Sequence, residues 1–385
     1  MTPFVFNTSP SIQFGAGLLA QLGEIVKERI GARILLVTDP GMMATGIVER
    51  ALDALKQAGV DVTLFSDVQA DPPEAIVLQA MQSAIDCAAQ GVVGLGGGSS
   101  LDVAKLVALL ASGTEMLKDA YGVGNAKGPR LPLILVPTTA GTGSEVTPVS
   151  IVTTGASEKM GVVSPVILPD IALLDPELTL GLPAHITAAT GIDAMVHAIE
   201  AYASGNANNN PLSRNLATEA LRLMGAALER AVHEGGDIGA RSDMLLGSML
   251  AGQAFANSPV AAVHALAYPI GGHFHVPHGL SNALVLPYVL RFNTKVAPQP
   301  YAEMAPYAFP DLARLEGQER AEAFCEAMAG LSRRCGLQQT LREMDIPRDF
   351  LPKLASDAMN QTRLLVNNPR EVSEADALSI YEAAW

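Results

Sequence analysis

The chain has 385 residues, of which 49% are hydrophobic and 17% are charged, with 35 glycines and 25 prolines. This length and composition are typical of a folded α/β protein with two domains and argue against a disordered chain. The formal net charge of −14, together with the lack of any Lys/Arg cluster interleaved with aromatics, argues against nucleic acid as a partner.

Neither the cysteines nor the apolar runs indicate a secreted or membrane protein. The three cysteines, Cys87, Cys325 and Cys335, have no C-x-x-C spacing, which argues against a disulfide framework and a zinc ribbon. The opening MTPFVFNTSPSIQFGAG has no basic start followed by an apolar segment, and no stretch reaches the roughly 18 apolar residues of a membrane span. We therefore expect a cytoplasmic protein without a membrane partner.

Apolar runs alternate with helical patterns through the first half of the chain. In chain order we predict a strand at 32–39, a helix at 47–59, a strand at 60–68, a helix at 73–91, a strand from 92 into glycines, a helix at 101–112 and a strand at 131–139. These strands are apolar without alternation, as in parallel sheets covered by helices on both faces. The pattern predicts a nucleotide-binding α/β domain.

Three consecutive glycines stand between a strand and a helix in GLGGGSSLDVAK (94–105). Backbone N–H groups of glycine can approach a phosphate closely, and the helix N-terminus favours negative charge. The alternative is a tight turn that binds nothing. Asp39 precedes this loop, whereas the acid of the usual dinucleotide fingerprint follows it. It could hydrogen-bond an adenosine ribose and repel a 2′-phosphate, or simply cap a turn.

Hydroxyl side chains follow another predicted strand, in VPTTAGTGSEVT (136–147). Open parallel sheets bind ligands at the carboxyl ends of their strands, so these groups could line a cofactor. After DPELTLGLPAHIT (175–187) the chain reads as successive amphipathic helices, with SGNANNNP (204–211) as a polar loop between two of them. We place the domain boundary near residue 180 and expect an all-α second domain.

Four of the seven histidines fall between residues 264 and 278. Asp193 and His197 are four residues apart in a helical stretch, so their side chains project from one face. We expect His264 to lie in a second helix that YPIGGHFHVP breaks, and His278 to follow Pro277 at a new helix start. One carboxylate and three imidazoles could bind Fe, Zn, Mn or Co. The alternative is an acid and three hydrogen-bonded core histidines.

Several motifs together resemble the iron-containing (group III) alcohol dehydrogenases of the dehydroquinate synthase-like superfamily. They are GGGSSLDVAK, PTTAGTGSEVT, DPELT, TAATGIDAMVHAIEAY, AGQAFANS and HALAYPIGGHFHVPHGLSNALVLPYVLRFN. The resemblance covers nearly all of the chain. It implies an NAD-binding, Rossmann-like α/β domain with a parallel sheet at 1–180 and a helical metal-binding and substrate domain at 181–385. It further implies an active site in the cleft between the domains, and a homodimer.

The resemblance also implies roles for individual residues. The metal ligands are Asp193, His197, His264 and His278, and the catalytic residues are His264, His278 and Tyr268. The cofactor-binding residues are Asp39, Gly97, Gly98, Ser99, Asp102, Thr138, Thr139, Thr147, Lys159 and Phe255. The cofactors are NAD, which Asp39 favours over NADP, and a divalent metal, with Fe²⁺ ahead of Zn²⁺.

One position departs from the family pattern. Many members have a second histidine four residues after the third ligand, where this chain has Tyr268. Because the ordinary pKa of tyrosine is about 10, it is a poorer base near neutral pH, although it could donate or relay a proton. Relatives that act on hydroxy acids also carry tyrosine there. His273 and His275 could take over a proton relay, but hydrogen-bonded loop histidines are the simpler interpretation.

The expected reaction is reversible hydride transfer between a small primary alcohol, or a hydroxy acid, and NAD, with the metal lowering the pKa of the alcohol. The alternatives within the family are reductases of the maleylacetate or 4-hydroxybutyrate type. A lyase of the dehydroquinate synthase kind should show several Lys/Arg residues near the metal, but 240–290 contains only Arg241. A nucleotide-binding protein without catalysis is the remaining alternative.

Overall fold

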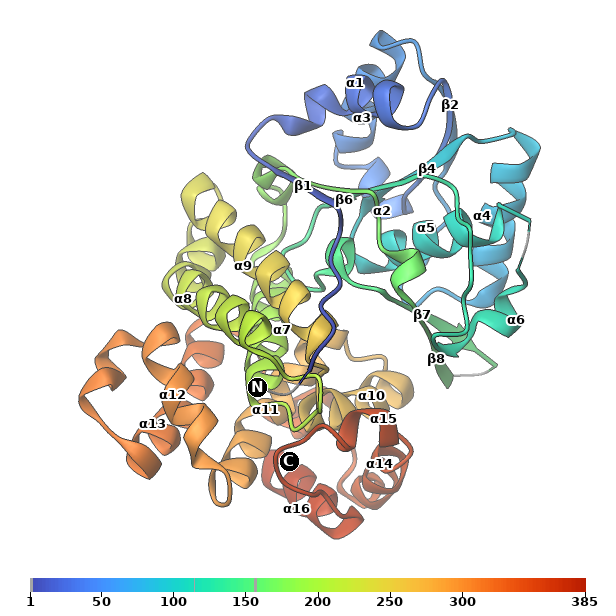
Figure 1. Ribbon diagram of the computed structural model, residues 1–385. Helices are drawn as coiled ribbons and strands as arrows, with labels where there is room; N and C mark the ends of the chain where they lie inside the picture. Colours follow the sequence, from blue (N-terminus) through green and yellow to red (C-terminus); the bar gives the residue numbers. More distant parts are fainter. Residues whose placement is uncertain (1–2, 114, 156–157) are drawn as a thin grey trace. The chain divides into compact units, whose positions relative to one another are not determined.

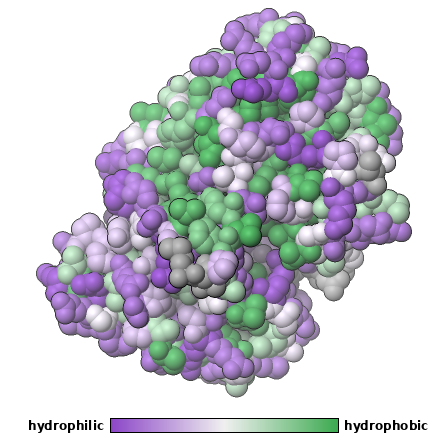
Figure 2. Space-filling view, in the orientation of Figure 1, coloured by the Kyte–Doolittle hydropathy of each residue, from purple (hydrophilic) through white to green (hydrophobic). Residues whose placement is uncertain are grey.

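The computed structural model describes residues 3–113, 115–155 and 158–385 (Figure 1). The chain forms two compact units, each with its own core. The α/β unit comprises Asn7–Thr139 and Gly143–Gly181, and the helical unit comprises Leu182–Trp385, Ala140–Thr142 and the start of the chain up to Phe6. Among the residues described, no helix is long and apolar enough to cross a membrane. On the face drawn in Figure 2, hydrophobic residues lie between hydrophilic ones.

The α/β unit is built on a six-stranded sheet in the order β1-β9-β6-β4-β2-β3. All of its strand pairings are parallel, which confirms the predicted sheet type. The strands are β1 Ser11–Phe14, β2 Arg33–Val37, β3 Asp61–Phe65, β4 Gly91–Gly96, β6 Leu133–Pro137 and β9 Ile171–Leu174.

Both faces of this sheet are covered by helices, which explains why the inner strands β2, β4 and β6 are apolar along most of their length. In β2, Leu35 and Val37 belong to one hydrophobic core, and Ile34 and Leu36 belong to the core on the other face. The helices on the Leu35 side are α4 Glu74–Asp86 and α5 Gly98–Leu110, and those on the Ile34 side are α1 Leu22–Arg29 and α3 Ile47–Gln57.

A second sheet of three strands, in the order β5-β8-β7, completes the α/β unit. Its strands are β5 Gly122–Val123, β7 Val149–Thr154 and β8 Glu158–Val163, and two short helices, α2 Pro40–Met43 and α6 Leu117–Ala120, lie in the same unit. We did not predict the β7–β8 hairpin, β1 or β9. Strands β1 and β9 have four residues each and pair with one another more than 150 residues apart, a pairing that no local pattern encodes.

The second unit is helical, as predicted. Its helices are α7 Ala184–Ala203, α8 Pro211–His233, α9 Ile238–Asn257, α10 Ala262–Phe274, α11 His278–Thr294, α12 Pro298–Ala308, α13 Gly317–Arg334, α14 Leu351–Ala358, α15 Thr362–Leu365 and α16 Glu374–Ala384. Helices α7, α8 and α9 pack against one another, and α11 packs against both α7 and α10.

The prediction that YPIGGHFHVP (268–277) breaks the helix is confirmed, although the break falls late in this segment. Helix α10 continues through Pro269 and ends only at His275, which adopts a left-handed conformation with φ 54°. A proline inside a helix removes one backbone hydrogen bond. Here Leu266, Ala267, Pro269 and Ile270 are all buried, and their packing offsets that loss. The predicted new start after Pro277 is confirmed, because α11 begins at His278.

Candidate metal centre

Three helices of the helical unit bring four candidate ligands together. Asp193 and His197 lie one turn apart on α7, His264 lies near the start of α10, and His278 is the first residue of α11. One donor atom from each residue can be chosen so that all four atoms lie within 4.8 Å of one another. The structure therefore gathers the carboxylate and the three imidazoles that the sequence had suggested.

The distances fit a single divalent cation. Asp193 Oδ1 lies 3.8 Å from His264 Nε2 and 3.7 Å from His278 Nε2. Ligand bonds of about 2.0–2.2 Å to one ion place neighbouring donors about 3–4 Å apart. The His197 and His264 rings are stacked with their centroids 4.7 Å apart, so the two imidazoles lie side by side at the cluster.

Burying these polar and ionisable side chains costs free energy unless a ligand binds to them. The Nε2 atom of His264 is buried and has no hydrogen-bond partner in the part of the chain that the structure describes. Burial lowers the pKa of His197 to about 3, although the Asp193 carboxylate acts in the opposite direction. Burial tends to raise the pKa of Asp193, but the three histidines and Asn282 outweigh it and lower the pKa overall. A neutral imidazole and an ionised carboxylate are the forms that bind a metal.

Neighbouring polar groups hold the candidate ligands in place. The His264 Nδ1–H group donates to Oε2 of Glu200 over 2.6 Å, and Glu200 Oε1 accepts a bond of 2.7 Å from the Val263 amide. The Asn282 amide donates to Asp193 Oδ1 over 2.6 Å. Such partners orient metal ligands, and a carboxylate that accepts from a ligating histidine also raises the basicity of that histidine.

We missed Glu200 and Asn282 in the sequence, although a signal existed. Glu200 lies three residues after His197, so it shares the helix face of the two α7 ligands. Asn282 lies four residues after His278, on the same face of α11.

Two aromatic residues that the sequence analysis predicted as site residues border the cluster. The Phe255 ring stacks on His197 with the centroids 4.4 Å apart. The Tyr268 ring lies 5.8 Å from that of His278 and is one turn along α10 from His264. Burial raises the pKa of Tyr268, and the charge and hydrogen bonding of Arg363 oppose this shift. Tyr268 is therefore a protonated neighbour of the cluster near neutral pH and not a base.

The two extra histidines have structural positions outside the four-donor cluster. His273 Nε2 lies 2.7 Å from Oδ2 of Asp357, and the His273 ring makes an edge contact with Phe350. His275 is the residue at which α10 ends.

Three neighbouring strands of the α/β unit carry the predicted cofactor residues at one edge. Asp39 follows β2, the glycine loop follows β4, and Thr138 and Thr139 follow β6, while these strands are adjacent in the order β6-β4-β2. Gly97 is the N-cap of α5, and Gly98 and Ser99 form its first turn. At Gly96 φ is 148°, and an added Cβ would lie 2.8 Å from Ser100 Oγ. Only glycine therefore fits at position 96, where the loop turns.

The Asp39 carboxylate is already held by this loop. Its Oδ1 accepts from the Met42 amide over 3.1 Å, which caps α2, and its Oδ2 accepts from Ser100 Oγ over 3.0 Å. The capping role that the sequence left open is therefore observed. Both interactions hold the charge beside the glycine loop.

The remaining predicted cofactor residues in this unit bind protein groups. Asp102 accepts hydrogen bonds from Ser144 Oγ over 2.6 Å and from the Ile151 amide over 2.9 Å. Lys159 pairs with Asp71 at 2.7 Å in the three-stranded sheet. Thr147 Oγ1 lies 3.3 Å from Nζ of Lys105.

Lys105 was not predicted to have a role, although a lysine in the apolar helix 101–112 was a visible signal. Its buried Nζ donates to Ser144 Oγ and to the Val149 carbonyl, each over 2.7 Å, and lies 3.4 Å from Asp102 Oδ1. Burial lowers the pKa of Lys105, and Asp102 opposes this effect. Lys105 thereby fastens α5 to the segment that follows β6.

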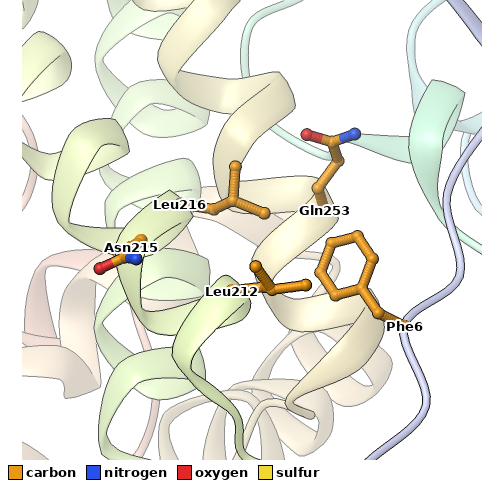
Figure 3. Close-up of a pocket in the computed structure, with 5 residues that line it drawn as sticks. All are labelled: Phe6, Leu212, Asn215, Leu216 and Gln253. Atoms are coloured by element: carbon orange, nitrogen blue, oxygen red, sulfur yellow. The ribbon is translucent and has the colours of Figure 1, made fainter.

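A pocket of the helical unit does not involve the candidate ligands. Figure 3 shows the residues that line it, which come from the chain start, α8 and α9: Phe6, Leu212, Asn215, Leu216 and Gln253. Its surface is almost entirely apolar, with no cluster of ionisable groups among these residues. The four-donor cluster is therefore the better candidate for chemistry.

The comparisons with known proteins agree with this architecture. Residues 9–176 match the family model described as iron-containing alcohol dehydrogenase, and residues 187–385 match the C-terminal model of the Fe-containing alcohol dehydrogenase family. The long-chain-alcohol dehydrogenase 1 of Geobacillus thermodenitrificans is 41% identical over 380 residues, covering 98% of this chain and 95% of the relative.

Solved structures give the same answer. A 1,3-propanediol oxidoreductase superposes with a TM-score of 0.95 at 34% identity, with 100% of both chains covered. The sulfoacetaldehyde reductase of Bifidobacterium kashiwanohense, in complex with NAD⁺, superposes with a TM-score of 0.88 at 29% identity, covering 100% of this chain and 99% of that one. The chain therefore belongs to the iron-containing alcohol dehydrogenase family, which confirms the resemblance. It is an oxidoreductase that interconverts alcohols and aldehydes.

Proposed function

We propose that the protein is an NAD-dependent alcohol dehydrogenase whose divalent metal is held by Asp193, His197, His264 and His278. The observation that carries this assignment is the unpartnered, buried Nε2 of His264 within a set of four donors that lie within 4.8 Å. The donor set suits Fe²⁺ first and Zn²⁺ second, given the family to which the chain belongs.

The α/β unit is proposed to bind NAD at the edge that carries the glycine loop. Gly97, Gly98 and Ser99 would hold the pyrophosphate at the N-terminus of α5, with Thr138 and Thr139 beside them. Asp39 would accept from the adenosine ribose and disfavour a 2′-phosphate. The NAD⁺ complex of the Bifidobacterium kashiwanohense relative supports this choice of cofactor.

Other predicted cofactor residues are proposed to act less directly. Because Asp102 is hydrogen-bonded to Ser144 and Ile151, its carboxylate would fix the segment that carries Thr147. Lys159 and Phe255 remain candidates for cofactor contact. We retain 1–180 as the NAD-binding domain and 181–385 as the metal and substrate domain.

The residues around the cluster suggest how the chemistry proceeds. A divalent cation, when bound, acts as a Lewis acid that lowers the pKa of a substrate hydroxyl and polarises a carbonyl. Glu200 and Asn282 would keep His264 and Asp193 oriented toward it. Tyr268, which stays protonated near neutral pH, would donate a hydrogen bond at the substrate. The proposed substrate is a small primary alcohol or hydroxy acid, and the reverse reaction reduces the aldehyde.

The location of the protein in the cell and its assembly are also proposals. The protein is proposed to be a cytoplasmic homodimer, and size-exclusion chromatography with light scattering would measure the number of chains in the particle.

A pair of histidine variants tests the assignment. His264→Ala should lose bound metal and NADH formation together, because a buried ligand of the cluster is removed. His233→Ala is the control, since His233 lies on α8 with Nε2 3.0 Å from the Arg334 carbonyl and is not among the four donors. A His264→Ala protein that turns over alcohol normally without metal would contradict the proposal.

A further inference from the structure

One of the four candidate ligands is exposed. Asp193, His197 and His264 are buried, whereas 41% of the side-chain surface of His278 is exposed. The Tyr268 ring lies 5.8 Å from the His278 ring. Tyr268 is therefore a neighbour of the exposed ligand.

The side chain of Arg363 is a charged neighbour of Tyr268. Arg363 lies on α15, which packs against α10, and its guanidinium acts on the Tyr268 hydroxyl through charge and hydrogen bonding. The residue is exposed at the surface. Arg363 is therefore an exposed cation that neighbours the Tyr268 phenol.

No acid neutralises Arg363 within the part of the chain that the structure describes. The ion pairs there involve other arginines and lysines, although the chain has 39 acidic residues against 25 basic ones. On α14, a further helix that packs against α10, Asp357 is already paired with Lys353 at 2.6 Å and with His273 at 2.7 Å. The positive charge of Arg363 is therefore available to a ligand.

We propose that Arg363 binds an anionic group at the far end of the substrate, so that the enzyme prefers primary alcohols and aldehydes that carry a carboxylate or a sulfonate. This inference rests on the proposed function of the four-donor cluster. The hydroxyl end of the substrate lies at the cluster, and Tyr268 lies between the two ends. The planar guanidinium pairs with a carboxylate or sulfonate through two parallel hydrogen bonds, which neutral alcohols cannot form.

The inference predicts a selectivity that depends on one side chain. For the metal-loaded wild-type enzyme, kcat/KM should be higher for 4-hydroxybutanoate than for 1-butanol, which has the same carbon chain without the anion. In Arg363→Gln the ratio of these two kcat/KM values should fall about tenfold to a hundredfold, mainly through KM of the acid, as expected for a charged hydrogen bond. Arg363→Lys keeps the charge but not the bidentate geometry, so its ratio should lie between those of the wild-type enzyme and Arg363→Gln.

A matched control separates this effect from a general loss of positive charge. Arg333→Gln removes an exposed arginine from the last turn of α13 in the same unit, and the ratio should not change. Measuring 3-hydroxypropanoate, 6-hydroxyhexanoate and 2-hydroxyethanesulfonate in parallel shows which chain length and which anion fit. Metal content and the unfolding temperature of each variant report whether the site and the fold are intact.

Two results would overturn the inference. If Arg363→Gln lowers kcat/KM equally for 4-hydroxybutanoate and 1-butanol, then Arg363 only positions Tyr268. If the wild-type enzyme prefers 1-butanol, the anionic class is wrong, while turnover of 1-butanol with bound metal leaves the proposed function standing. Failure to oxidise any alcohol with metal and NAD present would instead reject both.

Discussion

Glu200 Oε2 accepts a hydrogen bond of 2.6 Å from Nδ1 of His264, and both side chains are buried. This contact fixes the tautomer of His264, because the proton on Nδ1 leaves Nε2 with a lone pair directed toward Asp193 and His278. The second Glu200 oxygen is held by the Val263 amide, so the carboxylate cannot rotate away.

Removing the Glu200 carboxylate should therefore weaken metal binding without removing a ligand. We expect Glu200→Ala to lower the affinity for Fe²⁺ or Co²⁺ about tenfold to a hundredfold, measured by competition with a chelator. Glu200→Gln can still accept a hydrogen bond from Nδ1 of His264, so its metal affinity should fall less. Glu219→Gln on the surface of α8 is the control. Unchanged affinity in Glu200→Ala would show that the contact does not tune His264.

The charge of Asp39 should decide between NAD and NADP. Asp39→Asn keeps a side-chain oxygen that can cap α2 but removes the charge beside the glycine loop. We expect kcat/KM for NADP relative to NAD to rise about tenfold, equivalent to about 1.4 kcal/mol of lost repulsion. Asp61→Asn, at the exposed start of β3, serves as the control. An unchanged ratio would assign Asp39 to capping alone.

A buried glutamate predicts how the stability of the α/β unit depends on pH. Burial raises the pKa of Glu145 to about 7, and its own backbone and Lys105 oppose this effect. The unfolded chain releases this proton near its ordinary pKa of about 4.3, so between about pH 4.3 and 7 the native state binds more protons. The Glu145 contribution to the free energy of unfolding therefore decreases as pH rises through this window and levels off above it.

Replacing this carboxyl by a neutral amide should remove that pH dependence. Glu145→Gln should match the wild-type unfolding temperature near pH 4.5 and exceed it increasingly up to about pH 7, where the gain in the free energy of unfolding is about 3–4 kcal/mol. Glu49→Gln, an exposed substitution in the first turn of α3, should show no such trend. A difference that is the same at every pH would contradict the raised pKa.

Local patterns in the sequence were enough to predict part of this molecule. Asp193 and His197 are one helical turn apart, and the family motif adds His264 and His278, so the ligand set could be named before the structure. The helices of the second unit followed from their periodicity. The expected lyase alternative also loses support, because the buried Arg241 already donates to Thr187 Oγ1 and to the Gly235 carbonyl.

Other features depend on contacts between distant segments. The pairing of β1 with β9 and the grouping of residues 140–142 with the helical unit arise from tertiary packing alone. Helix α10 continues through Pro269 because buried neighbours stabilise it against its local preference. The Tyr268–Arg363 contact joins residues 95 positions apart in the chain, and no spacing rule relates them.

Metal titration followed by turnover tests the central claim most directly. Chelator-treated protein would be titrated anaerobically with Fe²⁺, and bound metal and NADH formation from a primary alcohol would be measured on the same samples. The account predicts that activity rises in proportion to bound Fe²⁺ and saturates at one ion per chain, and that Asp193→Ala and His264→Ala bind none. Full activity in the metal-free wild-type protein, or unchanged metal binding in both variants, would contradict it.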